Sequence, residues 1–130
     1  MERQFSQQIG EAELLLTPKG TIYHLDLHPE QLADTIITVG DPTRVAAISK
    51  YFDKITHKSQ HREFACHGGY IDKKHVLVVS TGIGPDNIDI VLNELDALAN
   101  IDFQTRTINN TIRSLNIIRL GTCGSLHANI

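Results

Sequence analysis

Three apolar runs in the sequence have the length of a β-strand and end in glycine, hydroxyl or charged residues. They occupy positions 36–39, 76–79 and 116–120. Short apolar runs bounded by turn residues are typical of buried strands. We therefore expect buried strands over 36–40, 75–80 and 116–120.

Two segments that follow these runs carry helical signals. Asp41 can cap a helix that begins at Pro42, an arrangement that helix N-termini favour, with apolar residues at 45, 46, 48 and 52 on its buried face. Further along, Asp86 or Asn87 could cap a second helix, in which apolar residues recur at three- and four-residue spacing. The predicted buried face of this helix comprises Ile88, Val91, Leu92, Leu95, Leu98 and Ala99.

Turn residues and polarity indicate the remaining segments. We expect a short strand over 21–25, a turn at Gly68-Gly69, another turn over 72–74 and a long exposed connection over 102–114.

The alternation of strands and helices favours an α/β fold with a mixed, mostly parallel sheet flanked by helices. We expect one domain over 1–130, with an N-terminal extension over 1–20. A parallel strand that ends near residue 121 should feed another crossover, so the fold is expected to be incomplete at its C-terminus.

The first strand exit, Gly40-Asp41-Pro42-Thr43-Arg44, has the composition of an anion site. Glycine lets the backbone approach an anion, and a helix N-terminus offers free N–H groups and partial positive charge. Arg44 adds a cation one turn into the helix. A plain strand-to-helix turn with a surface arginine is an equal alternative.

The third exit carries Arg119, followed by Gly121 and Thr122. Arginine binds phosphate through paired hydrogen bonds. An unpaired charge in a buried strand costs on the order of 3–5 kcal/mol, so Arg119 needs an anionic partner. The alternatives are an exposed position or a structural pair with Glu63 or Glu94.

The second exit, Ser80-Thr81-Gly82-Ile83-Gly84, allows close approach of backbone to a ligand, although glycines there can also be plain turn residues. Ligands of open α/β sheets bind beyond the carboxyl ends of the strands. We therefore expect the three exits to form one anion site.

Composition excludes several function classes. A net charge of −3 gives no electrostatic basis for nucleic-acid binding, and no run approaches the ~18 apolar residues of a membrane helix. The polar N-terminus is unlike a signal peptide, and two cysteines without a CxxC pair favour the cytoplasm. The seven histidines show no zinc-binding spacing, so we expect no metal.

Six segments of the sequence occur in a recognisable order and spacing: Tyr23-His24-Leu25, Gly40-Asp41-Pro42-Thr43-Arg44, His61-Arg62-Glu63-Phe64, Ser80-Thr81-Gly82-Ile83-Gly84, Asn93-Glu94-Leu95 and Ile118-Arg119-Leu120-Gly121-Thr122-Cys123-Gly124. Together they resemble the nucleoside phosphorylase family, specifically its uridine-phosphorylase-like branch, from about residue 20 to the C-terminus.

The resemblance implies a pentosyltransferase of nucleoside salvage. Inorganic phosphate, the co-substrate, would attack the anomeric carbon of a nucleoside, with uridine expected, and release free base and pentose 1-phosphate. The transition state resembles an oxocarbenium ion, so the protein's task is positioning and electrostatic stabilisation. The resemblance implies neither a metal nor an organic cofactor.

The resemblance also implies roles for residues within one subunit. Those matching Gly40, Arg44, Arg119 and Thr122 bind phosphate in the family, and Thr122 would also contact ribose. Residues matching Thr81 and Gly82 form the adjoining loop.

Other matching residues imply a site shared between subunits of a homodimer or a ring of dimers. Arg62 would reach the neighbouring subunit's phosphate and His24 its ribose hydroxyl. Glu63 would lie near the dimer interface, where some relatives hold a monovalent cation. The ribose-binding glutamate and the general acid are expected beyond residue 130, so no catalytic residue is assigned, and the isolated chain is expected to be weakly active or inactive.

Three alternatives stay open. The chain could be a non-catalytic phosphate- or nucleotide-binding module, a purine nucleoside phosphorylase, or a nucleosidase that uses water. Arg44 and Arg119 disfavour the nucleosidase, because hydrolysis has little need for two anion-binding arginines.

Overall fold

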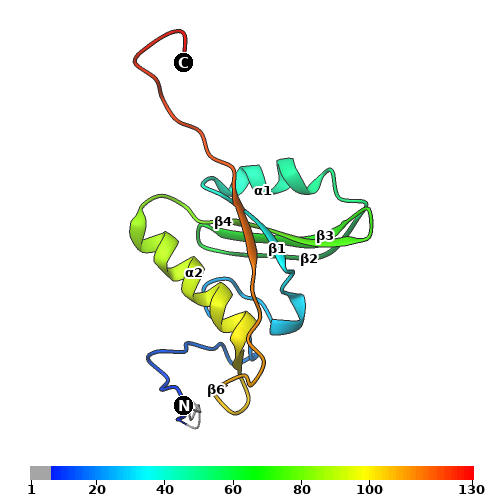
Figure 1. Cartoon of the computed structure of the whole chain (residues 1–130), viewed down its shortest axis with the longest axis vertical. Coiled ribbons are helices and arrows are strands. Elements are labelled where there is room, and N and C mark those ends of the chain that lie inside the picture. Colours follow the sequence, from blue (N-terminus) through cyan, green and yellow to red (C-terminus); the bar gives the residue numbers. More distant parts are fainter. Residues whose placement is uncertain (1–6) are drawn as a thin grey trace.

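The structure, a computed structural model, describes residues 7–130 and centres on a five-stranded sheet with the order β2-β3-β4-β1-β7 (Figure 1). The central strand β1 (Thr35–Val39) pairs in parallel with β4 (Lys74–Ser80) and β7 (Asn116–Arg119). Strands β2 (Lys54–His61) and β3 (Phe64–Ile71) continue the sheet in antiparallel pairings. The predicted mixed α/β sheet is therefore confirmed.

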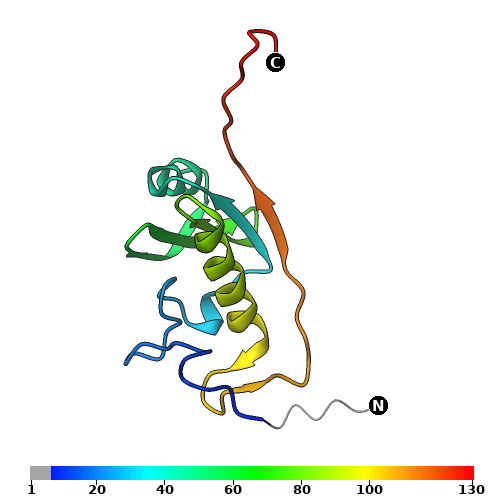
Figure 2. The same cartoon turned by 90° about the vertical axis from the view of Figure 1, so that its left-hand side faces the viewer.

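Helices α1 (Pro42–Ser49) and α2 (Pro85–Asn100) cover opposite faces of this sheet (Figures 1 and 2). Strand β4 contributes to both cores, because its side chains alternate between the faces. Val76 and Val78 belong to the core beside α1, whereas Leu77 and Val79 belong to the core beside α2. A strand covered on both sides is apolar at successive positions, as the sequence shows.

Helix α1 begins as predicted. Pro42 is its first residue, and the Asp41 carboxylate accepts a hydrogen bond from the Thr43 backbone N–H at 2.8 Å. One residue of the predicted buried face is wrong, since Ala46 is exposed. Ser49 is buried instead, and its hydroxyl lies 2.7 Å from His67 Nδ1.

Helix α2 begins earlier than predicted. Its N-cap is Gly84, with a φ of 103°, and the two predicted caps, Asp86 and Asn87, lie in the first turn. Leu92, predicted to be buried, is 45% exposed, whereas Glu94 is buried. Apolar periodicity could not reveal Glu94, because that pattern counts only apolar residues.

The predicted turn at Gly68-Gly69 is wrong, because both residues lie inside β3. A side chain at Gly69 would overlap the Lys54 carbonyl oxygen, where the β2–β3 register shifts between Ile55 and His57. Glycine therefore marks a close approach of two strands. The predicted turn at 72–74 is confirmed as the β3–β4 hairpin, with positive φ at both Asp72 and Lys73.

The predicted strand over 21–25 is a series of turns with a single bridge between Leu16 and Ile22, followed by the short helix η1 (Pro29–Gln31). Residues 1–6 of the predicted extension lie outside the described residues. Leu14 of that extension is buried in the core beside α2.

The predicted exposed connection over 102–114 is ordered by a hairpin of β5 (Ile101–Asp102) and β6 (Thr107–Ile108). The Arg106 guanidinium within it donates hydrogen bonds to the carbonyls of Ile9, Gly10 and Leu14. The connection thus ties the N-terminal segment to the body.

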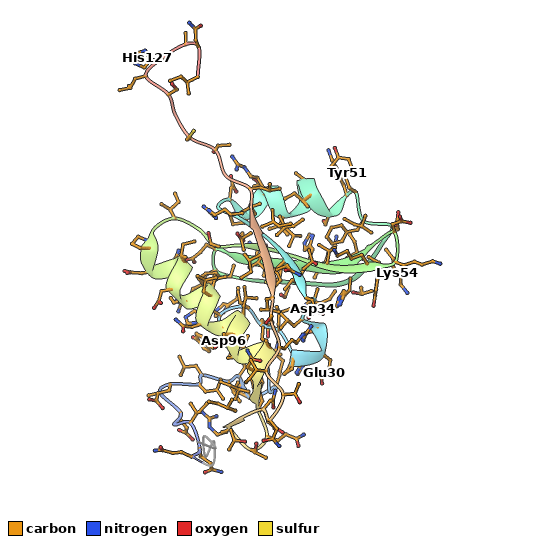
Figure 3. The ribbon with its side chains drawn as sticks, in the orientation of Figure 1. Glu30, Asp34, Tyr51, Lys54, Asp96 and His127 are labelled. Carbon is orange, nitrogen blue, oxygen red and sulfur yellow. The ribbon has the colours of Figure 1, made fainter. Side chains whose placement is uncertain are left out.

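Strand β7 forms where predicted but is exposed at all four positions, so the prediction of burial is wrong. It is one of the two edge strands of the five-stranded sheet, and neither α1 nor α2 buries it. The chain then extends away from the sheet toward the C-terminus, where His127 lies (Figure 3). No helix among residues 7–130 has the length and hydropathy needed to cross a membrane.

Candidate functional site

The three strand exits lie side by side because the hydrogen bonds of the parallel ladder continue past the strands. The backbone N–H of Thr81 donates to the Val39 carbonyl at 2.8 Å, and that of Leu120 donates to the Thr38 carbonyl at 2.9 Å. A third hydrogen bond of this kind joins the first two exits, because the Gly82 N–H donates to the Gly40 carbonyl at 2.8 Å. The predicted meeting of the three exits is therefore observed.

Beyond these exits lies an open cleft of about 770 Å³. Six residues predicted from the sequence line it: Gly40, Arg44, Glu63, Gly82, Arg119 and Thr122. The other lining residues are Asp41, Pro42, Ile83, Gly84, Asn87, Ile88 and Gly121.

Two arginines reach this cleft from different elements. Arg44 extends from the first turn of α1, and its Nη2 donates a hydrogen bond to Thr122 Oγ1 at 3.0 Å. Arg119 extends from the end of β7, and a Cβ atom placed on Gly40 would lie 3.8 Å from its Nη2. Within residues 7–130 neither arginine forms an ion pair, whereas Arg113 pairs with Asp34.

Arg119 is exposed, so the argument that burial demands an anionic partner does not hold for it. The case for an anion depends instead on the convergence of the two guanidinium groups. The N-termini of α1 and α2 also open on the cleft, through Pro42 and Gly84. Each contributes partial positive charge where the arginines meet, an arrangement that suits an anion.

One carboxylate on the cleft wall is held by an amide. Asn87 Nδ2 donates a hydrogen bond to Glu63 Oε1 at 3.0 Å. A Cβ atom on Gly82, which has a φ of 71°, would lie 2.7 Å from both Asn87 Nδ2 and Glu63 Cγ. The loop can therefore pass this pair only with glycine at position 82. Sequence analysis gave Asn87 no part in this site.

Three predicted residues do not line the cleft. Thr81 is buried, and its hydroxyl donates to the carbonyls of Val39 and Gly82, so its side chain stabilises the loop. Arg62 lies exposed at the β2–β3 turn with a φ of 53°. His24 packs elsewhere, against Glu94, with 2.6 Å between Nδ1 and Oε1.

Asp41, at the start of α1, and Cys66, on β3, have shifted pKa values. The hydrogen bond from the Thr43 N–H stabilises the charged form of Asp41 and lowers its pKa. Burial raises the pKa of the Cys66 thiol to about 12, so this thiol stays protonated at neutral pH and is no nucleophile. Cys123 is exposed beyond the cleft. Across residues 7–130, no three His, Cys, Asp or Glu side chains gather as a metal site would require.

Comparison with known proteins identifies relatives of this chain. A family model described as the phosphorylase superfamily matches residues 34–130. The uridine phosphorylase of Thermococcus kodakarensis is 31% identical over 95% of this chain, and a DeoD-type purine nucleoside phosphorylase of Bacillus velezensis is 30% identical over 82%. The matches span 40% and 41% of those relatives, so the chain has less than half their length.

A solved structure agrees with these relatives. The Trypanosoma brucei nucleoside phosphorylase, described as showing uridine phosphorylase activity, superposes with a TM-score of 0.77 at 41% identity. The match covers 86% of this chain and 39% of the trypanosomal one. The family model covers most of the chain and includes every residue that lines the cleft. This chain therefore belongs to the phosphorylase superfamily.

Proposed function

We propose that this chain forms the phosphate-binding part of a nucleoside phosphorylase, an enzyme that uses inorganic phosphate to cleave a nucleoside into free base and pentose 1-phosphate. The observation that carries this proposal is the convergence of Arg44 and Arg119 in one cleft, without ion-pair partners among residues 7–130. Membership of the phosphorylase superfamily supports the reaction class.

In this proposal the phosphate lies beside Gly40, between the two guanidinium groups. Arginine donates paired hydrogen bonds to phosphate oxygens, and hydrogen bonds between ionised groups are the strong ones. Thr122, which already accepts a hydrogen bond from Arg44, can donate its hydroxyl to phosphate or to ribose. Held in this way, the phosphate would present one oxygen to the anomeric carbon, so that catalysis depends on positioning.

Uridine is the proposed nucleoside. The relative from Thermococcus kodakarensis is named a uridine phosphorylase, and the trypanosomal nucleoside phosphorylase is described as showing uridine phosphorylase activity. The DeoD-type relative supports a purine nucleoside as the alternative. The exposed position of Arg62 and the placement of His24 outside the cleft fit a site completed by a second copy, in a homodimer or a ring of dimers.

A second candidate function is a phosphate-binding module without turnover. The observation in its favour is that both arginines and both helix N-termini that line the cleft come from residues 40–122 of this chain. We expect the 130-residue chain to bind phosphate and to turn over nucleosides weakly or not at all.

Calorimetric titration with inorganic phosphate tests the site. Hydrogen bonds to charged groups contribute about 1.5–3 kcal/mol, so Arg44→Met and Arg119→Met should each weaken phosphate binding about tenfold or more. Lys50→Met removes the same charge just after the other end of α1 and should leave affinity unchanged. Equal affinity in the arginine variants and the wild type would reject the site.

Release of free base from uridine and inosine, measured with and without phosphate, tests the reaction. Phosphate-dependent release from uridine supports a uridine phosphorylase, and faster release from inosine supports the purine alternative. Phosphate binding without any base release favours the module. Base release that does not depend on phosphate would contradict the phosphorolysis proposed here.

A further inference from the structure

Glu94 is a charged residue on the buried face of α2 that the proposed reaction does not use. It is 8% exposed and lies between Val91 and Leu98, which are 1% and 2% exposed. A carboxylate in such a place is stable only if its oxygens accept hydrogen bonds. Its partners therefore indicate why the helix tolerates it.

Within residues 7–130, the carboxylate makes three hydrogen-bond contacts, and all belong to the turn at residues 24 and 25, about seventy positions away in the chain. The backbone N–H of His24 donates to Glu94 Oε1 at 3.0 Å, and that of Leu25 donates to Oε2 at 2.9 Å. His24 Nδ1 lies 2.6 Å from Oε1. One buried carboxylate thus fixes both the backbone and the ring of His24.

This contact selects one form of the imidazole. An ionised carboxylate can only accept hydrogen bonds, so Nδ1 must carry the proton. In a neutral ring, Nε2 is then a hydrogen-bond acceptor, because the bond made by one ring nitrogen sets the state of the other. The rings of Tyr23 and Phe64 also pack against the imidazole in T-shaped contacts, with centroid separations of 4.9 and 5.6 Å.

His24 does not line the cleft of the two arginines but borders a separate cavity of about 340 Å³. Its side chain is 16% exposed. Glu94 and Asn93 of α2 border the same cavity, as does the segment 12–15. The two cavities are separate. A ligand group that contacts His24 from its own cavity therefore cannot be the phosphate that we propose beside Gly40 in the same copy.

We propose that Glu94 is a positioning residue that holds His24 in its Nδ1–H form, so that Nε2 accepts a hydrogen bond from a ribose hydroxyl of a nucleoside bound by a second copy of the chain. The assignment of the hydroxyl depends on the proposed phosphorylase function. The control of the imidazole by Glu94 is independent of that function and can be measured without any ligand.

Nitrogen-15 NMR of the histidine rings in the wild-type chain at neutral pH provides the first test. Long-range couplings from the ring protons distinguish a protonated from an unprotonated nitrogen, and His24→Asn assigns the signal. The expected result is a protonated Nδ1 and an unprotonated Nε2. A His24 ring with its proton on Nε2, or with both nitrogens protonated, would overturn the proposal.

Glu94→Gln tests the cause. The glutamine amide cannot accept from all three donors, so the His24 ring should become a mixture of forms, whereas Asp96→Asn on the same helix should leave it unchanged (Figure 3). Folding is verified by circular dichroism. If Glu94→Gln fails to fold, the wild-type spectrum alone decides the proposal.

Calorimetric titration of uridine and its 2′-, 3′- and 5′-deoxy analogues, with saturating phosphate, tests the ligand assignment. One lost hydrogen bond corresponds to about a tenfold loss of affinity, so one analogue should bind the wild type about tenfold more weakly than uridine. In Glu94→Gln that difference should fall below about threefold. A difference retained in full would overturn the positioning role. If no nucleoside binds, the hydroxyl assignment fails, while the NMR result still decides whether Glu94 controls the ring.

Discussion

Gly40 lies where β1 passes into α1, and the space beside its Cα is where we propose that phosphate binds. An added Cβ atom would lie 3.7 Å from the Gly82 carbonyl oxygen and 3.8 Å from Arg119 Nη2, which are ordinary contact distances. We therefore expect Gly40→Ala to fold with a free energy of unfolding within about 1 kcal/mol of the wild type. Its methyl group should nevertheless weaken phosphate binding about tenfold, measured by calorimetry alongside urea denaturation.

Gly124→Ala is the matched control. Its Cβ atom would meet nothing within 4 Å and lies outside the residues that line the cleft. Stability and phosphate affinity should both be unchanged. A Gly40→Ala protein that binds phosphate as well as the wild type would show that the anion does not lie beside Gly40.

Some residues of the site could be predicted from the sequence, whereas the contacts of others could not. Arg44 and Arg119 were predictable because each follows a strand exit, and parallel strands bring their exits to one edge. The contacts of Asn87 and Glu94 were not, although the sequence named Asn87 as a possible cap and Glu94 as a possible partner of Arg119, because helical periodicity does not show which distant segment a polar side chain reaches. Their contacts, to Glu63 and His24, join segments far apart in the sequence.

Strand β3 contains two adjacent glycines that provide an internal comparison. A Cβ atom on Gly69 would overlap the Lys54 carbonyl oxygen and lie 2.7 Å from Phe52 Cδ2, whereas one on Gly68 would have contacts at 3.8 Å. Overpacking of this kind costs about 1–3 kcal/mol, and backbone overlap brings the cost toward the upper end. We expect Gly69→Ala to lose about 3 kcal/mol of unfolding free energy and Gly68→Ala less than about 1 kcal/mol, measured in urea.

Equal effects of the two substitutions would show that the close approach of β2 to β3 is relaxed in solution. The pair also explains why the predicted turn at Gly68-Gly69 was wrong. Glycine serves both turns and close backbone approaches, and local sequence does not distinguish them. The irregular register with β2, which decides between them, is a contact between strands.

The elements that sequence analysis placed well are those whose signals are local. Helix α1 has its cap and proline in adjacent positions, and β4 is apolar along its length because helices cover both faces. Strand β7 has the same apolar character but lies exposed at the edge of the sheet. Its composition predicted a strand correctly and its surroundings incorrectly, because burial depends on what packs against a strand.

At the scale of the whole molecule, we expect three partly buried histidines on neighbouring strands to couple folding to pH. Burial lowers the pKa of His57 on β2, His67 on β3 and His75 on β4 below the ordinary value of 6.5. His57 shows the reason most clearly. Its Nδ1 lies 2.8 Å from Gln31 Nε2, whereas the Nε2 of the His57 ring is buried without a hydrogen-bond partner in residues 7–130. Burial therefore disfavours a second proton on this ring, and the charge of Asp26 offsets that effect only in part.

The direction of the pH effect follows from these shifts. Below pH 6.5 the unfolded chain binds protons that the folded chain does not, so the free energy of unfolding should fall as the pH drops from about 7 toward 5. Asp26 and Asp41 have pKa values lowered below 3.8, and the stability they contribute is lost only at more acidic pH. The window between pH 5 and 7 therefore reports the histidines.

Urea denaturation at pH 7.5, 6.5 and 5.5, in buffers without phosphate, measures this dependence. His57→Asn can keep an acceptor near the Gln31 amide and removes the titrating ring, so its stability should vary less with pH than that of the wild type. His127→Asn, on the exposed segment beyond β7, should keep the wild-type dependence. A wild-type stability that rises on acidification would mean that the folded chain binds more protons than the unfolded one, contrary to the partial burial of these rings in the sheet.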